Sequence, residues 1–88
     1  MIEDINKIQI GTKVYYQPEH YIKIPIRTIL GETKTINKYE NGIVKEIPDN
    51  NLTAIRVVYN CNGDWENYKN YTSALTDLKD LNLGWCYE

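Results

Sequence analysis

Few side chains in this sequence are of the types that catalyse reactions or bind metals. The chain contains one histidine, His20, and two cysteines, Cys61 and Cys86, which form no CxxC motif. A tetrahedral zinc site needs about four ligands at suitable spacing, and these residues do not supply them. Cys61 could meet His20 in space, but no motif supports a thiol nucleophile. We therefore expect no structural metal, no cofactor and no enzymatic activity.

The carboxylates form two close pairs, Asp64 with Glu66 and Asp77 with Asp80. Either pair could bind a cation, but neither matches a calcium-loop pattern. Asp77 and Asp80 are better explained by a short turn after Thr76. No glycine-rich phosphate loop is present. The carboxylate spacing is therefore more typical of turns than of catalysis.

Length and charge limit the classes of function. The 88 residues suffice for one domain, 1–88, and the net charge is −2. The sequence pI near 5.4 argues against the strong positive field of a typical nucleic-acid binder. No apolar run approaches the roughly 18 residues of a membrane span, and the N-terminus has no signal pattern. We expect no membrane association, a cytoplasmic location and reduced thiols.

Short segments with alternating apolar residues indicate that the fold is mainly β. They are GTKVYYQ (11–17), ENGIVKEI (40–47), AIRVVYN (54–60) and YTSALTDLKDLNLGW (71–85). The third segment puts Ile55, Val57 and Tyr59 on one face. Val44 and Ile47 are three residues apart, so a bulge is needed to place both in the core. The predicted core consists of Val14, Tyr16, Val44, Ile47, Ile55, Val57, Ala74, Leu78 and Leu81.

Turn signals separate these segments. Asn41-Gly42 predicts a turn before IVKEI, and Asn60 to Asp64 predicts another. Pro48 to Asn51 is a third turn cluster. Trp65 to Tyr68 fits one helical turn, and TDLKDL (76–81) fits a short 3₁₀ turn. The four strand segments therefore follow one another with short connections.

Residues 21–39 predict an additional β-hairpin arm. Ile22, Ile24 and Ile26 recur at every second position, and Pro25 restricts that strand to a sheet edge. Gly31-Glu32 predicts a two-residue turn. The arm is also the most basic part of the chain, because it holds Lys23, Arg27, Lys34 and Lys38 against Glu32 alone.

The order of the strand segments carries a resemblance. GIVKEI followed by IRVVY and then by the TDLKDL turn and LNLGW resembles the strands of an SH3-like barrel, the class that includes Tudor- and KOW-type modules. The resemblance covers residues 8–17 and 40–86 and implies an antiparallel barrel of about five strands into which the hairpin is inserted. The chain also resembles small uncharacterised bacteriophage proteins, which implies a bacterial host cytoplasm. Because one fold hosts many functions, this likeness does not fix an activity.

Aromatic residues provide the candidate binding surface. The aromatic residues that could converge on one rim of the barrel are Trp65, Tyr68, Tyr71, Tyr59, Tyr15 and Tyr16. Alternatively, Tyr16, Tyr59 and Trp85 fill the core of a chain without phenylalanine. SH3-like domains bind proline-rich peptides or methylated side chains through aromatic surfaces. The isoleucines of the arm must cover the barrel, pair with another copy or meet a partner. The predicted partner-binding residues are Tyr21, Ile22, Lys23, Ile24, Ile26, Arg27, Lys34, Trp65, Tyr68 and Tyr71.

Three classes of function are compatible with these residues. The leading hypothesis is a non-catalytic protein-binding module, in the form of a phage-encoded inhibitor of a host or defence protein with anti-CRISPR-like activity. The second is a nucleic-acid-binding barrel that uses the basic arm and the aromatic rim. The third is a small-molecule binder, such as a nucleotide-sequestering oligomer, which would need a pocket built between subunits. Separately, the hairpin of residues 21–39 could join copies of the chain in a homo-oligomer.

Overall fold

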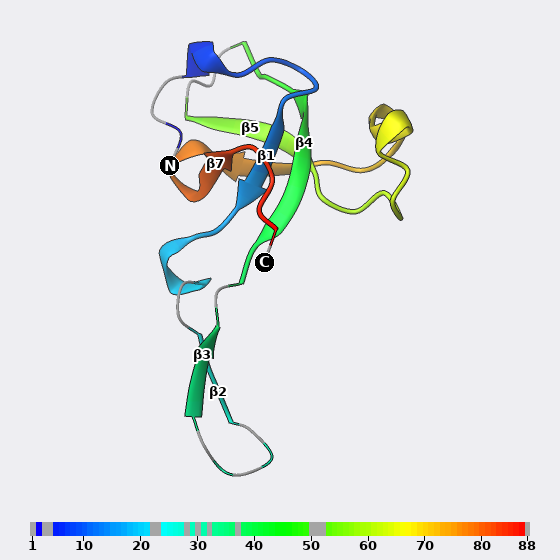
Figure 1. Cartoon of the computed structure of the whole chain (residues 1–88). Helices are drawn as coiled ribbons and strands as arrows, with labels where there is room; N and C mark the ends of the chain where they lie inside the picture. Colours follow the sequence, from blue (N-terminus) through cyan, green and yellow to red (C-terminus); the bar gives the residue numbers. More distant parts are fainter. Residues whose placement is uncertain are drawn as a thin grey trace.

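The computed structural model describes residues 2, 5–21, 24–27, 29, 31, 33–36, 38–49 and 53–87, and within 24–27 and 33–36 it describes the backbone. Seven β-strands and four 3₁₀ turns follow one another in these residues (Figure 1). The strands are β1 (Lys13–Tyr16), β2 (Ile24–Arg27), β3 (Thr33–Ile36), β4 (Glu40–Glu46), β5 (Ala54–Val58), β6 (Ala74–Asp77) and β7 (Leu81–Leu83). The 3₁₀ turns are η1 (Ile5–Lys7), η2 (Glu19–Tyr21), η3 (Trp65–Asn70) and η4 (Leu78–Asp80).

Five of the strands form one antiparallel sheet in the order β6-β5-β4-β1-β7. The mainly β fold, the five-stranded sheet and the 3₁₀ turn of η4 between the last two strands confirm the sequence predictions. In the described residues no pairing joins β6 to β7, so the sheet is curved but not closed. The predicted barrel is therefore open between these two strands.

The core is formed by residues of β1, β4, β5, η4 and β7, together with Ile2 and Ile8 near the N-terminus. Six of the predicted core residues are buried: Val14, Val44, Ile55, Val57, Leu78 and Leu81. The pairing of β4 with β5 shifts register between Val44 and Glu46. This bulge allows Ile47 to pack against the same cluster as Val44, as the spacing predicted. Tyr16 is partly buried at the margin of the core.

Ala74 is a wrong core prediction, because it is exposed. It lies opposite Val57 in the β5–β6 register, on the core side of the sheet. However, β6 is an end strand, and the sheet does not close over it. Alternation alone gives the correct face, but burial also requires an element that covers the residue.

A second buried group lies on the opposite face and was missed by the core prediction. Ile43 is buried beside Val44, and successive residues of a strand point to opposite faces. Its register partner Val58 and the nearby Cys61 are also buried. The 3₁₀ turn η3 packs against β4. The burial of both faces explains why β5 is apolar along almost its whole length.

The turn predicted at Asn41-Gly42 is wrong, because both residues lie inside β4. They pair with Tyr15 and Val14 of β1. A Cβ atom at Gly42 would lie 2.5 Å from Val57 Cγ1. Glycine is therefore required here by the close approach of β5, not by a turn.

The turn predicted at Asn60 to Asp64 is confirmed. Asn62 and Gly63 both have positive φ, at 54° and 80°, and Asp64 N donates to Cys61 O at 2.9 Å. Asparagine and glycine are the residues that adopt this conformation at least cost. In the predicted turn at Pro48 to Asn51, the structure describes residues 48 and 49, and residues 50 and 51 lie outside the described residues.

Strands β2 and β3 form the predicted hairpin, which lies apart from the five-stranded sheet in Figure 1. At the base of the hairpin, a backbone hydrogen bond from Lys38 N to Tyr21 O, at 3.0 Å, joins the segment before β2 to the segment after β3. The predicted two-residue turn at Gly31-Glu32 is wrong. Arg27 pairs with Thr33, so the hairpin register is not centred on residues 31 and 32.

Candidate binding surfaces

Ring contacts among the described residues form two clusters, and Tyr16 and Tyr59 lie in a different cluster from Trp65. In the first cluster, the rings of Tyr16 and Tyr21 are in edge contact, with centroids 5.5 Å apart. Tyr16 also contacts Tyr59 at 6.0 Å, and His20 contacts Tyr21 at 4.8 Å. This first cluster connects the margin of the core to the start of the hairpin.

The second cluster contains Trp65, Trp85 and Tyr87. The two tryptophan rings lie 4.9 Å apart, and Tyr87 lies 6.5 Å from Trp85. Trp85 Nε1 donates to Gly42 O at 2.8 Å, and Lys13 Nζ lies 4.6 Å from the centre of the Trp85 ring. Trp85 is therefore fixed on the surface of β4 and is not a core residue. Tyr87 is exposed.

Tyr68 and Tyr71, both predicted to bind a partner, stabilise the loop that contains η3. The Tyr71 hydroxyl donates to Asp64 Oδ2 at 3.1 Å, and this bond raises the pKa of Tyr71. Lys45 Nζ donates to Tyr71 O at 2.8 Å, which joins the loop to β4. The Tyr68 hydroxyl lies beside Gly11. Asp64 therefore accepts protein hydrogen bonds, which gives its carboxylate a structural role.

The predicted binding residues of the hairpin are described only in part. Ile22 and Lys23 lie outside the described residues. In the β2–β3 register, Ile24 lies opposite Ile36 and Ile26 opposite Lys34. Arg27 lies opposite Thr33 in the same register. The structure therefore establishes the backbone pairing of these predicted binding residues.

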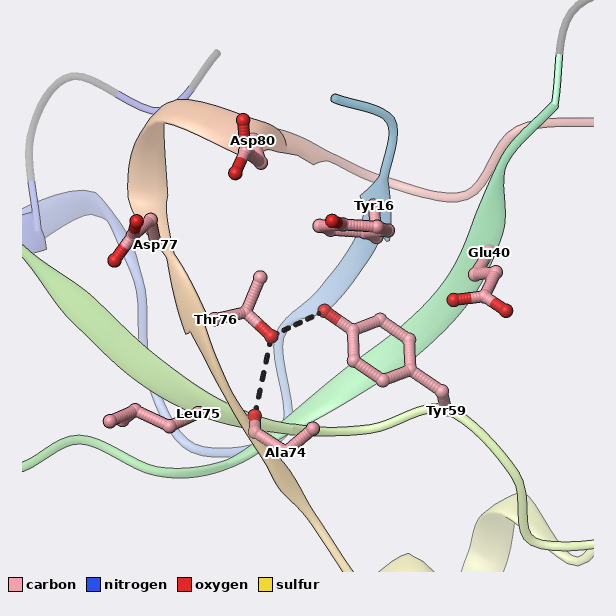
Figure 2. Close-up of a pocket in the computed structure, with 8 residues that line it drawn as sticks. All are labelled: Tyr16, Glu40, Tyr59, Ala74, Leu75, Thr76, Asp77 and Asp80. Carbon is pink, nitrogen blue, oxygen red and sulfur yellow. Dashed lines mark hydrogen bonds between the residues drawn. The ribbon is translucent and has the colours of Figure 1, made fainter. Parts of the chain in front are cut away.

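A pocket of about 400 Å³ lies where the open sheet leaves a gap (Figure 2). It is named the acidic pocket here. Its described lining consists of Tyr16, Glu40, Tyr59, Ala74, Leu75, Thr76, Asp77 and Asp80. These residues come from β1, β4, β6, η4 and the segment after β5, so the pocket depends on the assembly of the whole sheet.

One side of the acidic pocket is formed by a hydrogen-bonded chain (Figure 2). Thr76 Oγ1 donates its single proton to Ala74 O at 3.3 Å. The 2.8 Å bond between the Tyr59 and Thr76 hydroxyls must then have Tyr59 as the donor. Burial raises the pKa of Tyr59 to about 12. Tyr59 is thus a neutral hydroxyl at physiological pH, with its orientation fixed by Thr76.

The charge of the acidic pocket comes from Glu40, Asp77 and Asp80. Its described lining contains no lysine, arginine or histidine. Partial burial and the neighbouring Asp80 raise the pKa of Tyr16, because both oppose the formation of a second negative charge. The pocket therefore combines negative charge with aromatic rings, which is the environment that a cationic group prefers.

The described residues contain no candidate metal centre. No group of three or more His, Cys, Asp or Glu side chains in this part of the chain could hold a metal ion. His20 lies in edge contact with Tyr21, and Cys61 is a buried free thiol. Over the same residues, no helix has the length and apolar character to cross a membrane.

Sequence reasoning missed Glu40 and Thr76 as candidate site residues. Glu40 is far from Asp77 in the chain, and no local motif contains both. Thr76 precedes the predicted 3₁₀ turn, and its bond to Tyr59 follows from the packing of β5 beside β6. Only the convergence of several strands identifies these residues. No protein-family model matches this chain, and comparisons with curated proteins and with solved structures likewise give no match.

Proposed function

We propose that the chain is a non-catalytic protein-binding module whose acidic pocket receives a basic side chain of its partner. The observation that carries this proposal is the lining of the pocket, where three carboxylates lie around Tyr16 and Tyr59. A lysine or arginine side chain entering there would gain charge-assisted hydrogen bonds and contact with aromatic rings. The same pocket would repel a phosphate group.

The resemblance to bacteriophage proteins implies the kind of partner. It would be a host or defence protein in the bacterial cytoplasm, and binding would inhibit it. The hairpin of residues 21–39 would add a second contact, because its lysines and Arg27 favour an acidic surface on the partner. Both parts of this description rest on the sequence.

The test is affinity capture from bacterial lysate with matched charge variants. The pocket variant combines Glu40→Gln, Asp77→Asn and Asp80→Asn. The control combines Glu19→Gln, Glu46→Gln and Glu66→Gln, which are exposed carboxylates outside the pocket. Both variants carry the same net charge, so a non-specific effect of charge would change both equally.

We expect the wild type and the control variant to capture the same protein in similar amounts. The pocket variant should capture much less of that protein. Equal capture by all three chains would contradict a role for the acidic pocket. Circular dichroism of each variant establishes that loss of capture does not reflect unfolding.

Nucleic-acid binding is a second candidate function, and one observation favours it. Lys13 lies over Trp85, which contacts Trp65, and bases stack on such rings beside basic residues. A gel shift with single-stranded DNA tests it. Binding that weakens with salt and with Trp85→Ala would support this function, whereas no shift at low salt would contradict it.

A further inference from the structure

Strand β6 forms one end of the five-stranded sheet. It pairs with β5 along one side, and in the described residues no strand pairs with its other side. All four of its residues border the acidic pocket. The pocket therefore opens beside an unpaired strand edge.

The hydrogen-bond pattern shows which backbone groups lie on this edge. Leu78 N donates to Thr53 O at 2.8 Å, one step beyond the register pair Ala54 and Asp77. Hydrogen-bonded and non-hydrogen-bonded pairs alternate along an antiparallel ladder. Asp77 and Leu75 therefore occupy non-hydrogen-bonded positions, and their N–H groups point away from β5. Among the described residues, no turn or loop bond occupies these two amides.

The side chains of the edge also fit strand addition. Leu75 is 53% exposed. Exposed apolar residues on an edge strand favour pairing with another chain. Asp77 gives the same edge a negative charge beside Asp80. Pairing of β6 with β6 of a second copy would bring like charges together, which opposes self-association. A basic strand would instead complement this edge.

We propose that an extended basic segment of the partner pairs with the outer edge of β6 and places one lysine or arginine in the acidic pocket. This inference rests on the proposed function and specifies how the partner is recognised. Main-chain bonds from Leu75 and Asp77 would supply affinity, while the pocket would select the charged side chain. The recognised feature is thus an extended conformation together with a positive charge.

The experiment uses a short synthetic peptide in which threonine alternates with serine around one lysine. Two further peptides replace the lysine with glutamine or carry N-methyl groups on the main chain at alternate positions. The protein variants are Leu75→Pro, which removes the edge amide, and Leu75→Ala, which removes the side chain and keeps the amide. Proline is tolerated where the N–H faces away from the ladder. The N-methylated peptide lacks the N–H groups that would donate to the β6 carbonyls, so it tests edge pairing independently if Leu75→Pro does not fold.

Calorimetry should show that the lysine peptide binds and that the glutamine peptide binds more weakly. Leu75→Pro should weaken binding by roughly two- to tenfold, the value of one hydrogen bond, and Leu75→Ala should weaken it less. Peptide N-methylation should weaken binding at least as much as Leu75→Pro, because it removes more than one donor. Hydrogen exchange should show protection of the Leu75 and Asp77 amides in the complex.

Three results would overturn the inference. If Leu75→Pro and N-methylation leave the affinity unchanged while the pocket charge variant still loses it, edge pairing is wrong and the proposed function stands. If the lysine peptide binds no better than the glutamine peptide, both are wrong. If Leu75→Pro dissociates a dimer in sedimentation without changing peptide affinity, the edge belongs to a second copy.

Discussion

Gly42→Ala tests the packing of β4 against β5, because it adds one methyl group to a buried position. Gly42 does not adopt positive φ, so alanine meets no backbone strain there. At such positions the change normally stabilises a protein by about 0.4–1 kcal/mol through the unfolded state. Here the new Cβ would lie 2.5 Å from Val57 Cγ1 and 2.8 Å from Val58 O. The contact with Val57 Cγ1 is roughly 1–1.5 Å shorter than the optimum for a pair of carbon atoms.

The clash cannot be relieved by a surface rotamer, since Val57 is completely buried. Overpacking of this kind costs about 1–3 kcal/mol, and we expect it to exceed the gain from the unfolded state. A net loss of about 1–2 kcal/mol is large for a chain whose stability is roughly 4–13 kcal/mol at this length. The corresponding fall in Tm is about 4–16 °C.

Urea denaturation followed by tryptophan fluorescence measures this loss. Gly84→Ala is the contrasting variant, because Gly84 has φ of 84° and no atom near the added Cβ. It introduces backbone strain without a clash. Val57→Ala removes the Cγ1 atom, so Gly42→Ala should cost less in that background than in wild type. Equal or greater stability of Gly42→Ala, or the same cost in both backgrounds, would refute the steric argument.

Three other predictions concern the core, the acidic pocket and the hairpin. Ile55→Ala should lower the free energy of unfolding by about 2–5 kcal/mol, because Ile55 is fully buried, and a loss below about 1 kcal/mol in urea would contradict this. Burial raises the pKa of Tyr59 from 10.0 to about 12. The contribution of its neutral hydroxyl to the free energy of unfolding is therefore complete below pH 10 and is lost as the pH rises through 12. If Tyr59→Phe loses the same stability at alkaline pH, another group is responsible. The double variant Ile24→Ser with Ile26→Ser should weaken binding or self-association and change Tm by only a few degrees, whereas unfolding measured by circular dichroism would place these residues in the core.

The sequence by itself determined the local elements. Apolar alternation identified β1 and β5, and the spacing of Val44 and Ile47 identified the bulge that the register shift of β4 confirms. The asparagine and glycine of the Asn60 to Asp64 turn adopt the positive φ values that favour these residue types. Such features are predictable because each depends on neighbouring residues, whose conformational preferences are nearly independent of the rest of the chain.

The tertiary structure decided which local preferences prevailed. Asn41-Gly42 is a strong turn signal, but pairing of β4 with β1 on one side and β5 on the other places both residues within a strand. The open sheet left Ala74 exposed and created the acidic pocket, where Glu40 and Asp77 lie far apart in sequence. Their proximity depends on the register of several strands and on where the sheet fails to close. Those quantities arise from packing between distant segments, and no pattern of neighbouring residues encodes them.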